Sequence, residues 1–175
     1  MAIQVRAATV ADAAAVAGIH VRGWQWGYRG LLPDDFLAAQ DETLPRREAF
    51  WRGLIEGSAA GSGTRLWVAE RDGQVVGFAS TLPNREPDAP TDEAELTAIY
   101  LDAEAAGTGV GRALFAHASE DLRQRGFRTA ILWVLAANRR ARRFYEAAGW
   151  HPDGAVKIDA AHGVTLPQVR YRTTL

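Results

Sequence analysis

A glycine-rich hexapeptide, Gly107-Thr108-Gly109-Val110-Gly111-Arg112, carries the clearest chemical signal in the sequence. It follows an apolar stretch typical of a strand and precedes residues with helical spacing. Glycines let backbone N–H groups approach an oxyanion closely, and a helix N-terminus adds a favourable dipole of about 0.3–1 kcal/mol. These residues therefore predict a cradle for a phosphate group.

Two common nucleotide-binding motifs do not fit this loop. A P-loop requires Gly-Lys-Ser/Thr, which is absent. A Rossmann fingerprint needs a third glycine where Arg112 stands, and a carboxylate about 20 residues further on for the ribose. No Asp or Glu occurs from Leu122 to Tyr145, so a nicotinamide dinucleotide is a poor match.

The same acid-free stretch is rich in arginine, so its local field is positive although the net charge of the chain is −1. Arg139, Arg140 and Arg142 fall in the opening turns of a predicted helix, where the helix dipole disfavours cations. Two explanations stay open: a bound polyanion offsets these charges, or exposed arginines tolerate a cost of roughly a few tenths of a kcal/mol. The glycine loop favours the polyanion.

The elements that position these residues follow from hydrophobic periodicity and turn residues. Asp72-Gly73 between two alternating apolar segments is typical of a tight β-hairpin. Asn138 and Gly149 suit the two ends of one helix, and Gly126 the end of another. We expect strands at 3–7, 66–70, 74–80, 96–101, 130–135, 155–158 and 164–171. A turn at 160–163 joins the last two strands. We expect one helix after Thr9 and further helices in 33–39, 45–55, 110–122 and 139–148.

Strands that first form a hairpin and then alternate with helices predict a mixed sheet with helices on both faces. The aromatic segment from Trp24 to Pro33 contains two glycines and a proline, so we expect it to be a loop. From the residues alone, its aromatic side chains either line a pocket or cover the core.

The composition bounds the chain to one globular domain over residues 1–175. No segment approaches the ~18 consecutive apolar residues of a membrane span, so we expect a soluble protein with no membrane partner and, by default, a cytoplasmic one. The near-neutral charge argues against nucleic acid as a partner. Because the chain has no cysteine and its histidines lack paired spacing, we expect no metal site. Lys157 is the only lysine, a bias that codon composition explains.

Two segments, in this order and spacing, resemble the GNAT superfamily of acetyl-CoA-dependent N-acetyltransferases. The first runs from Glu95 through the glycine loop to Leu114, and the second is Asn138-Arg139-Arg140-Ala141-Arg142-Arg143-Phe144-Tyr145-Glu146-Ala147-Ala148-Gly149-Trp150. The resemblance covers nearly the whole chain. It implies an α/β (α+β) fold with a twisted, mostly antiparallel mixed sheet and a V-shaped cofactor cleft between two central parallel strands. It also implies acetyl transfer from acetyl-CoA to an amine by direct attack in a ternary complex.

The resemblance implies a set of residues for the acetyl-CoA co-substrate. The strand residues offer backbone hydrogen bonds to the pantetheine arm, the loop holds the pyrophosphate, and Asn138 binds the arm from the other side. The set is Ile99, Tyr100, Leu101, Gly107, Thr108, Gly109, Val110, Gly111, Arg112, Asn138 and Arg142. Where the family usually has Gln or Arg at the start of the loop this chain has Ala106, a departure that bears on cofactor affinity more than on cofactor identity.

Two catalytic residues follow from the same resemblance. Tyr145 is the expected acid for the leaving thiolate, with packing against the cofactor as the alternative. Glu95 is the expected general base, acting through water; the alternative is a solvated acid at a strand end, like Glu93 beside it. A backbone N–H near Ile99 would polarise the thioester carbonyl.

In this family the segment between the first two helices forms one wall of the acceptor site, which places Trp24 and Tyr28 there. Aromatic residues favour a ligand with apolar area or a cation held over a ring. The expected partner is a small-molecule amine or a peptide amine, and homodimer formation is compatible with the resemblance. His20 is close enough in sequence to reach this wall, but an ordinary part-buried histidine is the simpler interpretation.

Two alternatives belong to other functional classes. One is an acyl-CoA-binding sensor or regulatory module without turnover, which would not need Tyr145 or Glu95 for chemistry. The other is a nucleic-acid binder that uses the helix from Arg139 to Arg143, with salt-sensitive affinity.

Overall fold

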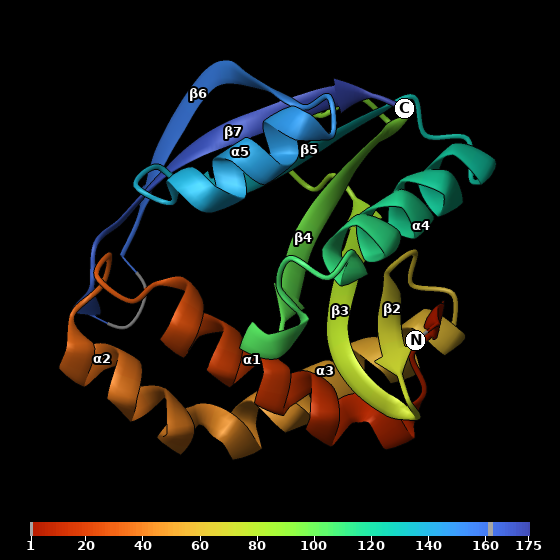
Figure 1. Cartoon of the computed structure of the whole chain (residues 1–175). Coiled ribbons are helices and arrows are strands. Elements are labelled where there is room, and N and C mark those ends of the chain that lie inside the picture. The colour runs from red at the N-terminus through yellow and green to blue at the C-terminus, as the bar shows by residue number, and fades with distance from the viewer. Residues whose placement is uncertain (1, 161–162) are drawn as a thin grey trace.

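The chain folds around a seven-stranded sheet in the order β1-β2-β3-β4-β5-β7-β6 (Figure 1). The computed structural model describes residues 2–160 and 163–175. Within these residues β4 and β5 pair in parallel, and the other neighbouring strands are antiparallel. The strands are β1 (Ile3–Ala7), β2 (Arg65–Arg71), β3 (Gln74–Pro83), β4 (Glu93–Leu101), β5 (Thr129–Leu135), β6 (His151–Asp159) and β7 (Leu166–Thr174). The predicted mixed, mostly antiparallel sheet is confirmed.

Helices cover both faces of the sheet because successive side chains of a strand point in opposite directions. Leu66 and Val68 of β2 pack with α1 and α3, whereas Trp67 and Ala69 pack on the other face with α4. Figure 1 shows α4 and α5 along the same side of the sheet. The helices are α1 (Ala13–Gly27), α2 (Asp34–Ala38), α3 (Leu44–Ala59), α4 (Val110–Gln124) and α5 (Arg139–Ala147), with 3-10 turns at Val10–Asp12, Ala39–Thr43 and Ala103–Ala105.

Turn and cap residues act where the sequence predicts. Asp72 and Gly73, with φ of 54° and 77°, join β2 to β3 in a tight hairpin. Asn138 begins α5, and its side-chain oxygen accepts the Ala141 N–H at 3.1 Å. Of the predicted turn at 160–163, residues 161 and 162 lie outside the described part of the chain. No described helix is long and apolar enough to span a membrane.

The aromatic segment from Trp24 to Pro33 is a loop only in its second half. The prediction is wrong for Trp24 to Gly27, which form the last turn of α1. Gly23, within the same helix, has a packing role: a Cβ there would lie 2.9 Å from the ring of Tyr100. This glycine therefore permits close packing of α1 against β4.

The two parallel strands separate soon after they pair. β4 and β5 are joined only over Glu93–Thr129, Ala94–Ala130 and Glu95–Ile131. Beyond Glu95 the two strands diverge, which confirms the predicted V-shaped opening.

A β-bulge lies at the point where the strands part. Ser80 of β3 pairs with Ala98 and Thr81 pairs with Leu96, so Thr97 is an extra residue in β4. Before the bulge Leu96 packs in the core on the α4 side, and after it Ala98 packs in the core on the α1 side. The extra residue shifts the alternation, so that Glu95 and Tyr100 line the same small pocket although they are five positions apart.

Candidate active site

The glycine loop forms a backbone cradle at the N-terminus of α4. Gly107 and Gly109 adopt φ of 76° and 94°, in the left-handed region that L side chains rarely adopt. Gly111 allows close packing, since a Cβ there would lie 3.3 Å from Leu101 and 3.6 Å from Phe144. The first N–H groups of a helix have no intrahelical acceptor, so those of α4 are available to an anion. This geometry fits a phosphate ligand.

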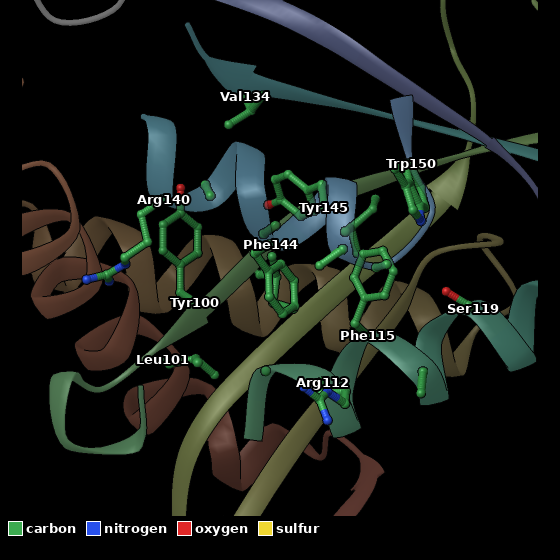
Figure 2. Close-up of a pocket in the computed structure, with 18 of the residues that line it drawn as sticks. Tyr100, Leu101, Arg112, Phe115, Ser119, Val134, Arg140, Phe144, Tyr145 and Trp150 are labelled. Atoms are coloured by element: carbon green, nitrogen blue, oxygen red, sulfur yellow. The ribbon is translucent and has the colours of Figure 1, made fainter. Parts of the chain in front are cut away.

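A cleft of about 1470 Å³ extends from this cradle into the opening between β4 and β5. Its walls are the second half of β4, the glycine loop, α4, α5 and the end of α1. Figure 2 shows Phe115, Phe144, Tyr145 and Trp150 along the cleft, with Arg112 at its edge. A cleft of this size, with an anion cradle at one end and aromatic walls, accommodates a long ligand that carries phosphate.

The expected cofactor residues do not all face this cleft. Ile99, Tyr100, Leu101, Gly107, Gly109, Gly111, Arg112 and Asn138 line it, whereas the side chains of Thr108 and Val110 do not. The Leu101 carbonyl already accepts the indole N–H of Trp26 at 2.9 Å. The backbone groups of Ile99 and Tyr100 are therefore better placed to meet a ligand than that carbonyl.

Arg142, expected to contact the cofactor, points elsewhere. Its guanidinium donates to the Tyr171 hydroxyl and to the Ala136 carbonyl, both at 3.0 Å, and it does not line the cleft. Arg140 lines the cleft instead, with its guanidinium 3.9 Å from the ring centroid of Trp26 (Figure 2). Of the arginines in the first turns of α5, Arg140 is thus the one that faces the cleft.

Tyr145 lies on the wall of the cleft, on the last turns of α5 (Figure 2). Its ring packs against Phe115, Phe144 and Tyr171. Burial, and to a smaller extent the neighbouring Tyr100, raises the pKa of the Tyr145 hydroxyl far above its usual value. The phenol therefore keeps its proton throughout the physiological range and can donate it inside the cleft.

Glu95 lies in a second, smaller cavity of about 210 Å³. Burial raises the pKa of its carboxyl group, and Lys157 opposes that rise. The pocket and the cleft share a wall made of Tyr28, Leu96, Thr97, Tyr100 and Trp133. Glu95 lines only the small pocket and Tyr145 lines only the cleft, so the two side chains belong to the two cavities that share this wall.

Trp24 and Tyr28 converge on the side chain of Tyr100 within this shared wall. The Trp24 indole N–H donates to the Tyr100 hydroxyl at 3.0 Å, and the Tyr28 hydroxyl lies 3.4 Å from the same Tyr100 hydroxyl. Trp24 lines the small pocket and Tyr28 lines both cavities, and their role in binding an acceptor stays a prediction.

His20 lies behind this wall and lines neither cavity. Its Nδ1 accepts the Trp51 indole N–H at 3.0 Å, and the guanidinium of Arg47 lies against its ring. Burial, with a smaller effect of Arg47, lowers the pKa of His20 to about 3. A neutral, packed histidine in this position supports the wall.

Glu93 is not the solvated acid that the sequence suggested. It is 2% exposed and accepts hydrogen bonds from Asn84, Thr129 and Arg172. The pairing of β4 with β5 and of β5 with β7 brings these partners together. Glu93 therefore ties the strands together at the closed end of the opening.

Sequence reasoning missed three side chains that shape the small pocket: Tyr100, Trp133 and Lys157. Tyr100 was expected to act through its backbone alone, and Trp133 lay in a strand with no local motif. Lys157 is the only lysine in the chain, but the codon-composition explanation for that count gave no reason to assign it a role.

Comparison with known proteins agrees with this geometry. The family model "Acetyltransferase (GNAT) family" matches residues 25–150. A relative from Mycobacterium tuberculosis, described as "Probable N-acetyltransferase", is 31% identical over 97% of this chain and 92% of its own length. A solved ribosomal-protein-alanine N-acetyltransferase from Brucella melitensis has a TM-score of 0.77 and 27% identity over 98% of this chain and 99% of that chain. The PaiA N-acetyltransferase from Thermoplasma acidophilum, solved with coenzyme A, shares the fold at a TM-score of 0.76, with 18% identity and full coverage of both chains.

The cradle, the parted strands and these similarities define an acyltransferase of the coenzyme A-dependent type. The chain belongs to the GNAT family of N-acetyltransferases.

Proposed function

We propose that this protein transfers the acetyl group of acetyl-CoA directly to an amine while both substrates are bound. The observation that carries the proposal is the junction of the two cavities at the parting of β4 and β5, with Tyr145 on one side and Glu95 on the other. In this arrangement the cleft takes acetyl-CoA and the small pocket takes the amine.

The chemistry needs a neutral amine, a polarised carbonyl and a proton for the leaving sulfur. An amine of pKa ~10.4 is neutral in about one molecule in 2,500 at pH 7, equivalent to about 4.6 kcal/mol. Glu95 offsets part of this by accepting a proton from the amine through water. The amine nitrogen forms a bond to the acetyl carbon, the carbon–sulfur bond breaks, and the Tyr145 hydroxyl donates its proton to the leaving sulfur. The second proton of the nitrogen passes through water to the Tyr145 oxygen and restores the hydroxyl, so that the products are the amide, the thiol and the one proton held by Glu95.

Backbone groups supply the remaining stabilisation. In this proposal an N–H near Ile99, next to the bulge, donates to the carbonyl oxygen, and the N–H groups of residues 107–112 hold the pyrophosphate. Arg112 and Arg140 add positive charge along the cleft. Ala106 removes one side-chain donor from the cradle but leaves its backbone intact.

The first test is calorimetric titration with acetyl-CoA, with NADH and a random DNA duplex as controls at physiological salt. We expect micromolar binding of acetyl-CoA and none of the controls. A screen of amines by thiol release then measures turnover. Binding of acetyl-CoA without thiol release for any amine would favour the sensor, and salt-sensitive binding of DNA would favour the nucleic-acid binder. The cytoplasmic location, the single domain and the homodimer stay predictions.

A further inference from the structure

The small pocket that holds Glu95 contains one cation as well as this carboxylate. Lys157 of β6 and Gln168 of β7 pair across the two strands, and both line the pocket. The neighbours of Lys157 on this edge strand, Val156 and Ile158, are 74% and 71% exposed. Lys157 is exposed as well, but its side chain turns over the pocket wall and places the ammonium group 4.2 Å from the ring centroid of Trp133.

The ring of Trp133 has two cations near it, Lys157 and Arg170, and the two differ in whether they form ion pairs with carboxylates of the protein. Arg170 lies 5.6 Å from the ring centroid and forms ion pairs with Glu86 at 2.6 Å and with Asp153 at 2.8 Å. Among residues 2–160 and 163–175, no carboxylate oxygen lies within 4 Å of the Lys157 nitrogen. The cation that lines the pocket is therefore the one without a protein counter-ion.

This pattern of charge selects among amines. A carboxylate and an ammonium group in one cavity complement a ligand that carries an amine and an acid. A diamine or an aminoglycoside would bring a second positive charge towards Lys157, which costs binding energy. The volume of about 210 Å³ is below the range of roughly 300–1,000 Å³ usual for drug-sized ligands, so the acceptor is small.

We propose that the acceptor is a small amine that carries a carboxylate, and that Lys157 binds this carboxylate while Glu95 faces the amine. This inference rests on the proposed function of the same site. The carboxylate belongs to a free amino acid or to the C-terminus of a very short peptide, two sources that share this chemistry.

The test compares acceptors that differ only in the acid group. For each of several amino acids, kcat/KM is measured by thiol release with the free acid, its α-amide and the amine that lacks the carboxyl carbon. Comparison of free amino acids with dipeptides distinguishes the two sources of the carboxylate. Putrescine is included as a diamine without a carboxylate. We expect the acid to exceed its amide by about tenfold or more, the usual range for a hydrogen bond to a charged group.

Substitutions at Lys157 connect that preference to this side chain. In Lys157→Met the ratio of acid to amide falls to about one, whereas Lys157→Arg keeps the charge and most of the preference. In Lys157→Glu the preference turns towards putrescine. The affinity for acetyl-CoA, measured by calorimetry, reports whether each variant is folded, because Lys157 does not line the cleft.

Two results would overturn the inference while leaving the proposed function intact: equal turnover of acids and amides, or an unchanged ratio in Lys157→Met. Binding of the same acids and amides to protein saturated with coenzyme A gives a second readout without turnover. Selective, Lys157-dependent binding of acids without thiol release would support the carboxylate site and contradict the transferase chemistry. Binding of neither form together with no thiol release would contradict both.

Discussion

The two cavities of this protein differ in what makes them. The cleft of about 1470 Å³ is shaped by glycines, exposed strand backbone and aromatic rings, and charged side chains stand mainly at its edge. The pocket of about 210 Å³ contains side chains from α1, the following loop and four strands, including one carboxylate and one ammonium group. We therefore expect the cleft to bind its ligand largely through backbone groups and the pocket to bind its ligand through side chains. Substitutions should affect the two cavities in different ways.

The largest effect is expected where a side chain enters the backbone cradle. Gly109→Glu places a negative charge against the pyrophosphate and should abolish measurable acetyl-CoA binding. Gly126→Glu is a matched control at the other end of α4, because its φ of 89° and its open surroundings resemble those of Gly109. Both variants should lose similar stability, but calorimetry should find lost binding only in Gly109→Glu. Equal binding by the two variants would contradict the cradle.

Tyr145→Phe removes a proton donor from the cleft and leaves its shape unchanged. We expect kcat to fall by about 10²–10⁴-fold, the usual contribution of general acid catalysis, with the dissociation constant of acetyl-CoA within twofold. Tyr171→Phe is the control, since its hydroxyl bonds to Arg142 and Glu146 outside the cleft. If kcat of Tyr145→Phe also stays within twofold, water supplies the proton.

Glu95→Gln tests the pocket side of the junction. Because burial raises the pKa of Glu95, activity should be lost as the pH falls through a value above the usual carboxyl range. Because ionised Glu95 takes a proton from the protonated amine, the wild-type log rate should rise with pH at a slope of about one up to the pKa of Glu95 and then level off, whereas in the variant the slope of about one should continue towards the pKa of the amine. At neutral pH the rate should fall by about 10²-fold. An unchanged pH profile would remove Glu95 from the mechanism.

The smallest effect concerns the wall between the cavities. His20 has a folded-state pKa of about 3, below its unfolded value of about 6.5, so protons bind the unfolded chain more readily. The free energy of unfolding should therefore decrease as the pH falls from about 6 to 3, by at most about 1.4 kcal/mol per pH unit. Urea denaturation at pH 7, 5 and 4 measures this change. In His20→Asn, which keeps an acceptor for Trp51, this part of the pH dependence should disappear.

The contrast between the cleft and the small pocket also explains which features could be predicted from the sequence. The cradle and Tyr145 lie in contiguous motifs, and the hairpin at Asp72-Gly73 depends on adjacent residues, so local patterns suffice. The pairing of Arg140 with Trp26 requires that the ends of α1 and α5 meet, and Glu93 is buried only because β7 brings Arg172 to it. Neither fact is local in sequence. Lys157 became informative only once β6 placed it over Trp133.

The shared wall between the cavities also has a kinetic consequence. In the proposed ternary complex, coenzyme A would occupy the cleft lined by α4 and α5, and the acetylated product would occupy the pocket lined by Trp24, Leu166 and Gln168. Because the two products would then lie in different cavities, we expect each to leave without waiting for the other. Product inhibition should accordingly be competitive only within a cavity: coenzyme A against acetyl-CoA, and the acetylated product against the amine.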